Sequence, residues 1–343
     1  MSHPGLYRGR LAGRAIRGSG LIETLVAMAL ALLVVGTAVA AFVKGRDAHT
    51  AAETIAHLQE TARYALAVIE SDLRMSGHLG LHSHPGLVAN LDDDLADPVG
   101  NVVAFAGCAA DWVTDLDASV AGWDQADGHF GLGPNCPPTG AWRASTDGLV
   151  LRRASSDRIE HTAAGLRAYA RHVLIVTGHA SGKVFVGDAN GTIPPGYAAS
   201  DPAGTTPLAE TRRLLVHAYY VSSGSSDGAG FPSLRRKRLV AGPAVQDEEI
   251  IPGVEDLQVQ YGVDADDSGA ADRWLNAGEI TEDMEVIAAR IWLRVRARER
   301  DVAWNDTTLY RYANQDETLP DAERPFRRVL VTKTIHLRNS VAP

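Results

Sequence analysis

The residue types best suited to hold a metal ion lie together in one short segment of the C-terminal half. Oxygen-bearing side chains stand at its relative positions one, three, five and nine, at Asp264, Asp266, Ser268 and Asp272. With Gly269 at position six, this is the spacing of a calcium-binding loop of the EF-hand type. Position twelve is Leu275, so Glu279 or Glu282 would have to supply the expected acidic ligand from farther on. The segment predicts either a structural calcium site or an acidic β-turn, since Asp, Ser and Gly also favour turns.

No sequence motif of an enzyme is present. The chain has no G-x-S-x-G, no H-E-x-x-H and no glycine-rich phosphate loop, and its 12 histidines are scattered without metal-ligand spacing. We therefore predict a protein that is not an enzyme and requires no cofactor. Because triads assemble in space, a membrane-tethered periplasmic hydrolase or ligand-binding protein stays open as an alternative of another class. Its binding surface would be formed by Trp112, Trp123 and Trp142, which otherwise predict local core.

Two cysteines, Cys108 and Cys136, lie in a loop-rich segment with little periodicity. The simplest interpretation is a disulfide that closes this segment, which would add about 3 kcal/mol of stability by restricting the unfolded chain. Two free thiols are the alternative. Without a C-x-x-C pair, the cysteines favour neither a zinc site nor a redox centre.

A long apolar stretch near the N-terminus contains a single charged residue. Residues 18–43 are long enough for a helix, rising ~1.5 Å per residue, to cross a hydrocarbon core of ~30 Å. Glu23 interrupts this stretch, and because a carboxylate inside a bilayer costs a few kcal/mol, it requires a partner. The preceding segment carries four arginines and no acid, so the positive-inside rule keeps it in the cytoplasm and sends Lys44 onward across the membrane.

Three kinds of segment fit this pattern. A plain signal anchor explains the arginines but not Glu23, and a cleaved secretory signal would use the A-x-A site at residues 38–40. The third kind is a type IV prepilin signal, which these residues resemble closely. Gly18 stands at the glycine before the cut, and residues 21–23 read Leu-Ile-Glu as in that family. We favour the third, because the helical pattern continues past residue 40 without restarting.

The resemblance to prepilins implies a processing route and a role for the carboxylate. A prepilin peptidase would cut between Gly18 and Ser19 on the cytoplasmic face, and the new amine would be methylated. The family usually has phenylalanine where this chain has Ser19, a departure that bears on methylation. Glu23 would pair with the N-terminal ammonium of a neighbouring subunit, which offsets the cost of its burial.

Cleavage would also change the charge of the chain. The whole chain has 33 basic and 42 acidic residues, and loss of the four arginines of the leader would leave 29 basic ones and a net charge of −13. An acidic protein outside the cytoplasm offers no overall electrostatic case for binding nucleic acid, so none is expected as a partner.

Further segments resemble the PilW-type minor pilins of type IV pili. Residues 58–80 read LQETARYALAVIESDLRMSGHLG, and residues 250–264 read IIPGVEDLQVQYGVD, like a strand of PilW-type heads. The Leu-Arg-Asn at residues 337–339 resembles the family's ending. Altogether the likeness covers roughly residues 18–80 and 230–340.

This resemblance implies a minor pilin that takes part in starting a type IV pilus, at or near its tip, in cell adhesion and twitching motility. The implied partners are the prepilin peptidase, the other minor pilins, the major pilin, the inner membrane and a tip adhesin. The prepilin would sit in the inner membrane with a periplasmic head and later join the extracellular pilus. A GspJ-like pseudopilin of type II secretion is the alternative within the same class, although the head here is large for it.

The hydrophobic pattern predicts an α+β fold, with a long N-terminal helix packed on an antiparallel β-sheet head with long loops. The resemblance implies that this fold is of the type IV pilin kind. We expect a cytoplasmic leader at 1–18, a transmembrane and assembly helix at 19–43, an amphipathic helix at 44–79 and a periplasmic β-rich head at 80–343. Apolar residues of the amphipathic helix recur at spacings of three and four, at Ile55, Leu58, Ala62, Leu66, Ile69 and Leu73. Gly77 is expected to end this helix.

Strand patterns begin at Asp147 and continue to the C-terminus. Short apolar or alternating runs are expected as strands at residues 147–154, 172–178, 182–187, 214–222, 234–242, 250–264, 286–300 and 327–339. The alternation along residues 286–300 predicts that one face of this strand lies in the core. The other face carries Arg290, Arg294 and Arg296, so it is expected to be solvated or to pair with acidic groups. The basic run at residues 235–238 predicts either a docking patch or a strand edge guarded by charge.

Overall fold

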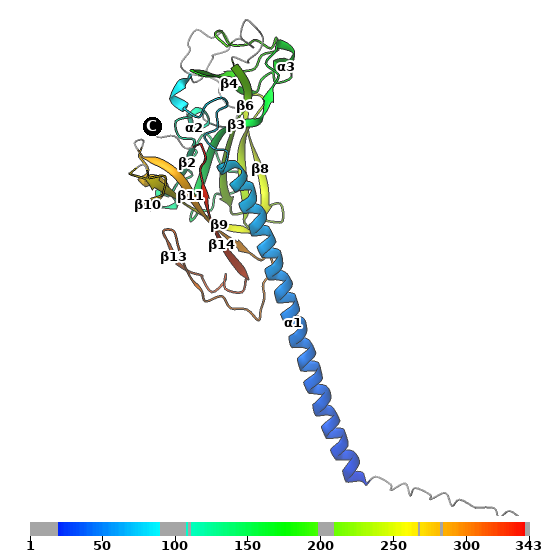
Figure 1. Ribbon diagram of the computed structural model, residues 1–343. Coiled ribbons are helices and arrows are strands. Elements are labelled where there is room, and N and C mark those ends of the chain that lie inside the picture. Colours follow the sequence, from blue (N-terminus) through cyan, green and yellow to red (C-terminus); the bar gives the residue numbers. More distant parts are fainter. Residues whose placement is uncertain are drawn as a thin grey trace, which may run out of the picture. The chain divides into compact units, whose positions relative to one another are not determined.

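The computed structural model describes residues 20–89, 108, 111–197, 209–266, 268–281 and 284–339 (Figure 1). Gly18 and Ser19, between which the peptidase cut is predicted, lie outside the described residues. Contacts within the chain divide it into two compact units, Met1–Glu53 and Thr54–Pro343. The second unit combines the end of a long helix with a strand-rich head, so the predicted α+β fold is confirmed. The finer bounds expected at residues 18, 43 and 79 stay predictions.

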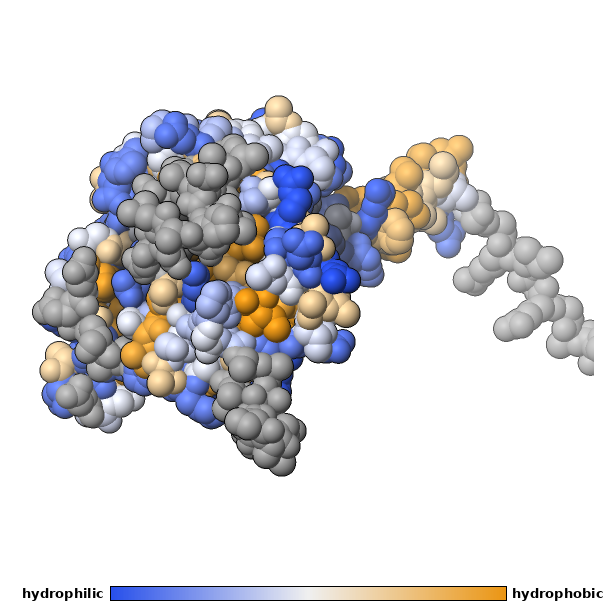
Figure 2. All heavy atoms as spheres, turned by 90° about the horizontal axis from the view of Figure 1, so that it is seen from above, coloured by the Kyte–Doolittle hydropathy of each residue, from blue (hydrophilic) through white to orange (hydrophobic). Residues whose placement is uncertain are grey.

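Helix α1 runs from Leu21 to Leu73 and contains 53 residues, so it joins the predicted transmembrane and amphipathic segments without a break. Its first part is apolar on every side, and Leu25, Leu32 and Phe42 are exposed there. Within the described ranges it is the one helix that is long and apolar enough to cross a membrane. Figure 2 shows the apolar residues gathered along this part of the helix.

From Thr54 onward, α1 packs on the head through the apolar stripe predicted from the sequence. The buried residues of this stripe are Leu58, Ala62, Leu66, Ile69 and Leu73, and Ile55 packs against them at the margin. Their spacing places them on one face of the helix. The helix therefore supplies one wall of the head's core.

The helix ends at Leu73, and a turn of three residues separates this end from Gly77, the residue expected directly after it. The amides of Met75 and Ser76 donate to carbonyls three residues back, so the chain tightens into turns directly after Leu73. Gly77 has φ +74°, and a Cβ at this residue would lie 2.6 Å from the backbone oxygen of Asn339. Gly77 thus permits a close approach of the C-terminal segment, beyond the helix end.

The strands of the head form three sheets. The largest has the order β1-β5-β4-β6-β3-β2, with β7 paired to β6 and β8 to β7. Its strands are β1 (Val88–Ala89), β2 (Val120–Trp123), β3 (Gly148–Ile159), β4 (Val173–Gly178), β5 (Gly182–Val186), β6 (Ala209–Ser222), β7 (Ser233–Val240) and β8 (Ala244–Pro252). The second sheet has the order β10-β9-β11-β14, with β9 (Val254–Asp264), β10 (Arg273–Leu275), β11 (Glu285–Arg296) and β14 (Arg328–His336). The third is the hairpin of β12 (Leu309–Tyr312) and β13 (Gln315–Thr318).

Short helical segments connect these strands. They are α2 (Asp111–Thr114), α3 (Ala163–Arg167) and the 3₁₀ turns η1 (Pro85–Leu87), η2 (Gln125–Asp127) and η3 (Ala277–Glu279). Each strand segment predicted from the sequence contains a strand, and all pairings are antiparallel except the short contact of β1 with β5. The pattern missed β8, whose acidic sequence hides the alternation, and the short strands β10, β12 and β13.

One apolar core joins α1 to both larger sheets. Besides the helix stripe it contains Leu149, Leu151, Tyr219, Val221, Leu234, Leu257, Val259, Tyr261, Ile291 and Leu293. The β11 residues predicted to face inward, from Ile287 to Ala297, are buried as expected. Strands of both sheets share this core with the helix. Without α1, the apolar inner face of each sheet would be exposed to water.

A buried carboxylate, Asp72, fixes the end of α1 on the largest sheet. Asp72 is 3% exposed, and its two oxygens accept from Arg153 at 2.8 Å, His217 at 2.5 Å and Tyr219 at 2.5 Å. Arg236 stands 3.7 Å away. Burial alone would raise the pKa of Asp72, but the hydrogen bonds from His217, Tyr219 and Arg153 outweigh it and hold this pKa well below its usual range. The helix end is therefore held by a charged network as well as by apolar packing.

Asp147, directly before β3, ties the two larger sheets to each other. Its backbone N–H donates to the carbonyl of Leu257 in β9. Its carboxylate accepts the amide hydrogens of Val259 and Gln125, each at 2.9 Å. The side chain thus takes the place of a neighbouring strand at the edge of β9, which gives the backbone of that edge a partner.

The basic run at residues 235–238 is neither a docking patch nor a guarded edge, because β7 lies between β6 and β8. Its side chains meet acids of β8, with Arg235 on Asp247 at 2.8 Å and Arg236 on Glu248 at 2.5 Å. Lys237 also approaches Asp247, at 3.0 Å. The sequence prediction failed here since β8, the strand that carries the acids, was not recognised.

The outer face of β11 pairs with acidic groups, one of the two predicted alternatives. Glu255 is fully buried, and Arg294 and Arg328 contact its carboxylate at 2.7 Å and 2.6 Å. Arg296 reaches Glu323 at 2.6 Å. These arginines are buried too, which is tolerable only because each guanidinium has a carboxylate partner.

Asp72→Asn should destabilise the head by about 3–5 kcal/mol, because it leaves the guanidinium of Arg153, whose side chain is only 15% exposed, without its carboxylate. Glu70→Gln, two residues earlier, is the matched control, since it breaks ion pairs at the surface with Lys333 and Arg74 that are worth about 1 kcal/mol or less. The pKa of Asp72 is lowered from 3.8 in the folded chain. Its contribution to the free energy of unfolding is therefore present above pH 3.8 and is lost as the pH falls below it. Urea denaturation of the full-length chain in detergent measures both variants, and equal losses would contradict this assignment.

Asp147→Asn should remove part of the pH dependence of stability. Burial raises the pKa of Asp147 from 3.8 to about 7, and the neighbouring carboxylates of Asp124 and Asp256 add to the rise. Between these values the native chain keeps a proton that the unfolded chain releases, so stability falls as the pH rises, by at most about 1.4 kcal/mol per pH unit. Denaturation at a series of pH values tests this, with the exposed Asp117→Asn as control. An unchanged slope in Asp147→Asn would refute it.

Candidate functional site

Glu23 lies in the first turn of α1, two residues after the helix begins. Its carboxylate has no hydrogen bond or ion pair within the part of the chain that the structure describes. The positive end of the helix dipole favours a carboxylate at this position, but by less than about 1 kcal/mol. Glu23 is thus a charge in an apolar surface that still requires a counter-charge.

The surface around Glu23 is apolar on all sides of the helix. Exposed large side chains between residues 21 and 43 are Leu21, Ile22, Leu25, Val26, Met28, Leu30, Leu32, Leu33, Val34, Val35, Val39, Phe42 and Val43. A helix that is apolar all round must be covered by lipid or by other helices. Glu23 and these side chains together form a surface for a bilayer or for helix–helix packing, which we call the apolar segment of α1.

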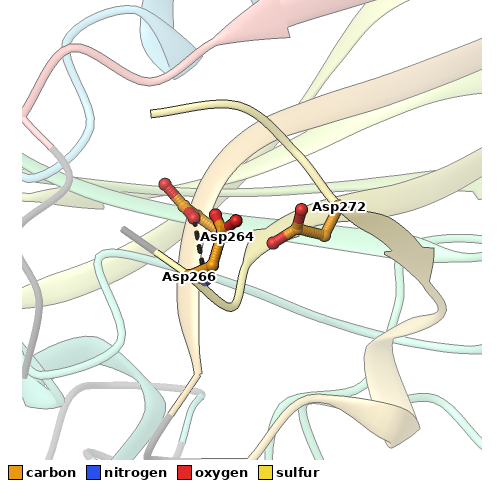
Figure 3. Close-up of side chains that lie close together, drawn as sticks. All are labelled: Asp264, Asp266 and Asp272. Carbon is orange, nitrogen blue, oxygen red and sulfur yellow. Dashed lines mark hydrogen bonds between the residues drawn. The ribbon is translucent and has the colours of Figure 1, made fainter. Parts of the chain in front are cut away.

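The acidic loop follows β9 and precedes β10. Asp264, Asp266 and Asp272 each bring a carboxylate oxygen within 4.8 Å of the others. Figure 3 shows these three side chains close together. Asp264 accepts from the amides of Asp266 and Ser268 at 3.2 Å and from Gly269 at 2.6 Å. Burial raises the pKa of Asp264, but the hydrogen bonds from these amides outweigh it and lower the pKa below its usual range.

The carboxylates therefore already close the loop as a turn, and they fit a cation only in part. Leu275 at position twelve pairs with Tyr261 in the β9–β10 ladder, and Glu279 accepts the amide of Asn276 at 2.8 Å. Glu282, the other residue considered for this ligand, lies outside the described residues. Three carboxylates remain, with the Ser268 hydroxyl nearby in sequence. A calcium ion at this loop stays a prediction.

A disulfide joins Cys108 and Cys136 across 28 residues. Both cysteines belong to a second apolar core together with Trp123, which is 4% exposed. Phe130 contacts the Trp123 ring edge-on at a centroid distance of 5.0 Å. Trp112 and Trp142 pack against the same core, so all three tryptophans serve as local core.

The Asp72 network and the Asp147 junction were missed by the sequence reasoning. A signal for Asp72 was present, because it lies three residues after Ile69 on the buried face of α1. A charged residue on the apolar face of a helix requires a buried partner. Asp147 gave no such signal, since an aspartate before a strand is usual in a turn.

The C-terminal part of the chain matches a known protein family. Residues 218–339 match the family model of Type IV Pilus-assembly protein W. This range begins within β6 and continues past β14, so it includes the acidic loop and the whole second sheet. No curated protein and no solved structure matches the chain. The predicted resemblance to PilW-type pilins is confirmed by this match.

If the acidic loop binds calcium, millimolar Ca²⁺ should stabilise the chain by about 1–2 kcal/mol, as expected for a site of extracellular-grade affinity. Asp264→Asn combined with Asp266→Asn should abolish this stabilisation, measured as a rise in melting temperature, because two of the three carboxylates that would face the ion lose their charge. The exposed Asp157→Asn is the control and should keep the rise. A wild-type chain whose melting temperature is the same with Ca²⁺ and with chelator would show that the loop is only a turn.

Proposed function

We propose that this chain is a PilW-type minor pilin that helps to start assembly of a type IV pilus and sits at or near its tip. The observation that carries the proposal is the apolar segment of α1 with its one unpartnered carboxylate, Glu23, on a chain whose head matches the pilus-assembly family. Neither feature alone would suffice. A membrane anchor has no need of Glu23, and a head alone has no means of joining a filament.

The proposed mechanism begins in the inner membrane. The apolar segment holds the prepilin there with its head in the periplasm, and the prepilin peptidase removes the leader between Gly18 and Ser19. The new amine at Ser19 is the site of methylation. In the bilayer, Glu23 stays near the interface, where water reaches it. The free-energy cost of removing its carboxylate from water is therefore small before assembly.

Extraction into the filament changes the surroundings of Glu23. Neighbouring helices then replace both lipid and water, and the N-terminal ammonium of an adjacent subunit becomes the available counter-charge. Pairing offsets the desolvation of both groups only if they meet closely, so the pair selects the register between two helices. The partners in this step are the other minor pilins and the major pilin.

The size of the head supports a low copy number. The unit from Thr54 to Pro343 is attached to a single helix, and a bulky head on every subunit would hinder continuous stacking. A place at the tip, with a tip adhesin as a further partner, avoids this hindrance. Roles in cell adhesion and twitching motility would follow from the pilus in the extracellular space.

The GspJ-like pseudopilin remains the second candidate within the same class, since the same helix chemistry would serve type II secretion. The match of residues 218–339 to the pilus-assembly family favours the pilus. A tethered hydrolase or ligand-binding protein would need a surface for its ligand. The tryptophans considered for this role pack into the core instead.

Glu23→Ala and Glu23→Gln should both be inserted and cleaved after Gly18 but should be lost from sheared pili by about tenfold or more, the ratio expected when 1.4 kcal/mol or more of pairing is removed. Glu60→Gln, at an exposed position later in the same helix, is the matched control and should assemble normally. Quantitative immunoblots of sheared pili and of membranes measure recovery.

The N-terminal sequence of each purified variant, from strains with and without the peptidase, reports cleavage. Normal recovery of Glu23→Ala in sheared pili would mean that the carboxylate has no role in assembly. An N-terminus that is the same in both strains would contradict processing by the peptidase.

A further inference from the structure

Strand β14, at the red end of the sequence colouring in Figure 1, is a long and regular edge strand. It contains nine residues and, among the described strands, pairs only with β11, in an unbroken register from Arg328 opposite Arg296 to His336 opposite Ala288. The opposite edge of the same sheet is the three-residue strand β10. Within the described chain, the second sheet therefore has one edge long enough to accept another strand.

The backbone groups on the free side of β14 can be identified from its register. The amides of Leu337 and Ala297 make bonds at the two ends of the pairing, to Ile287 and Arg327, each at 2.8 Å. Because bonded pairs alternate along an antiparallel ladder, the odd-numbered residues of β14 face β11. The N–H and C=O groups of Leu330, Thr332 and Thr334 point outward.

These three residues are open to solvent. Leu330 is 38% exposed, and Thr332 and Thr334 are exposed as well. Their outward backbone groups have no hydrogen-bond partner among the described residues. The strand thus presents a row of donors and acceptors with small, uncharged side chains beside them.

Proteins guard such edges with charge, proline, bulges or short length, because an open edge invites pairing with another chain. The run RVLVTKTIH has no proline, no acid and no register shift, and its β-branched residues favour a strand. Its one lysine, Lys333, reaches Glu70 of α1 at 2.5 Å and does not stand over the edge. By contrast, β8 carries Asp247, Glu248 and Glu249, and its register against β7 shifts between Leu234 and Arg235. The edge of β14 is long and unguarded.

We propose that the free edge of β14 is a docking site for an edge strand of a neighbouring pilin head. This rests on the proposed function, in which the apolar segment of α1 brings other subunits alongside. The neighbour's strand would pair with the outward groups of Leu330, Thr332 and Thr334, an addition of one strand to the second sheet. Since β14 has basic but no acidic side chains in an otherwise acidic protein, a strand from an acidic pilin head meets no like-charge repulsion.

Photo-crosslinking in cells that assemble pili tests this proposal with the full chain. A photoreactive amino acid at Thr332 should yield a product with another pilin, and the joined peptide should belong to a strand of its head. The same probe at the exposed Gln246 of β8 is the control and should give a signal weaker by about fivefold or more, because that edge is guarded. A probe at Leu32, in the apolar segment, reports assembly through the helix.

The outcomes separate the two proposals. Products at Leu32 without products at Thr332 overturn the edge proposal and leave the proposed function standing. Products at Thr332 that join only two copies of this chain also overturn it. Absence of products at both positions overturns the assembly role, and the edge proposal with it.

Substitutions at Thr332 supply an independent test, in which crosslinking is measured from a photoreactive amino acid at Thr334. Thr332→Pro removes only an outward N–H, so the ladder with β11 is kept while crosslinking should fall about fivefold or more. Thr332→Lys should have the same effect, because a charged side chain on the edge disfavours pairing with another strand. This variant replaces the proline variant if the latter does not fold. Thr332→Val keeps the N–H and the shape and should crosslink like the wild type. Equal crosslinking in all three variants would overturn the proposal.

Discussion

The packing of one helical face against two sheets is the constraint on which the rest of this structure depends. From Leu58 to Leu73, α1 fills the space that strands of both larger sheets leave open, and Asp72 fixes its end through a charged network. The same helix continues backward into the apolar segment without a break. The apolar segment and one wall of the head's core therefore belong to a single continuous helix.

Many charged side chains of the head form ion pairs with one another. The basic side chains of β7 meet the acids of β8, and Arg294 and Arg328 meet Glu255 in the interior. These basic side chains of β7, β11 and β14 are therefore already paired within the head. This agrees with a function in which contacts to other subunits come from an apolar helix and, as we propose, from the backbone of an open strand edge.

The sequence predicted much of this architecture because periodicity reports burial directly. The stripe on α1 and the alternation along β11 were both confirmed, since a side chain's face follows from its position in a helix or strand. Prediction failed where charge masked the pattern. β8 was missed because Asp247, Glu248 and Glu249 look like a loop until β7 is placed beside them, and for the same reason the basic run at residues 235–238 was misinterpreted.

The candidate sites divide in a similar way. Glu23 could be found from the sequence alone, because a carboxylate in an apolar helix is anomalous wherever that helix lies. By itself the sequence determined the long helix, the strands with alternating faces and the likeness to PilW-type pilins. Only the tertiary structure decided that Asp72 and Asp147 are buried junctions and that β14 has an open edge. The physical reason is that partners far apart in the chain, such as Asp72 and His217, are set by strand order and register, which local sequence patterns do not encode.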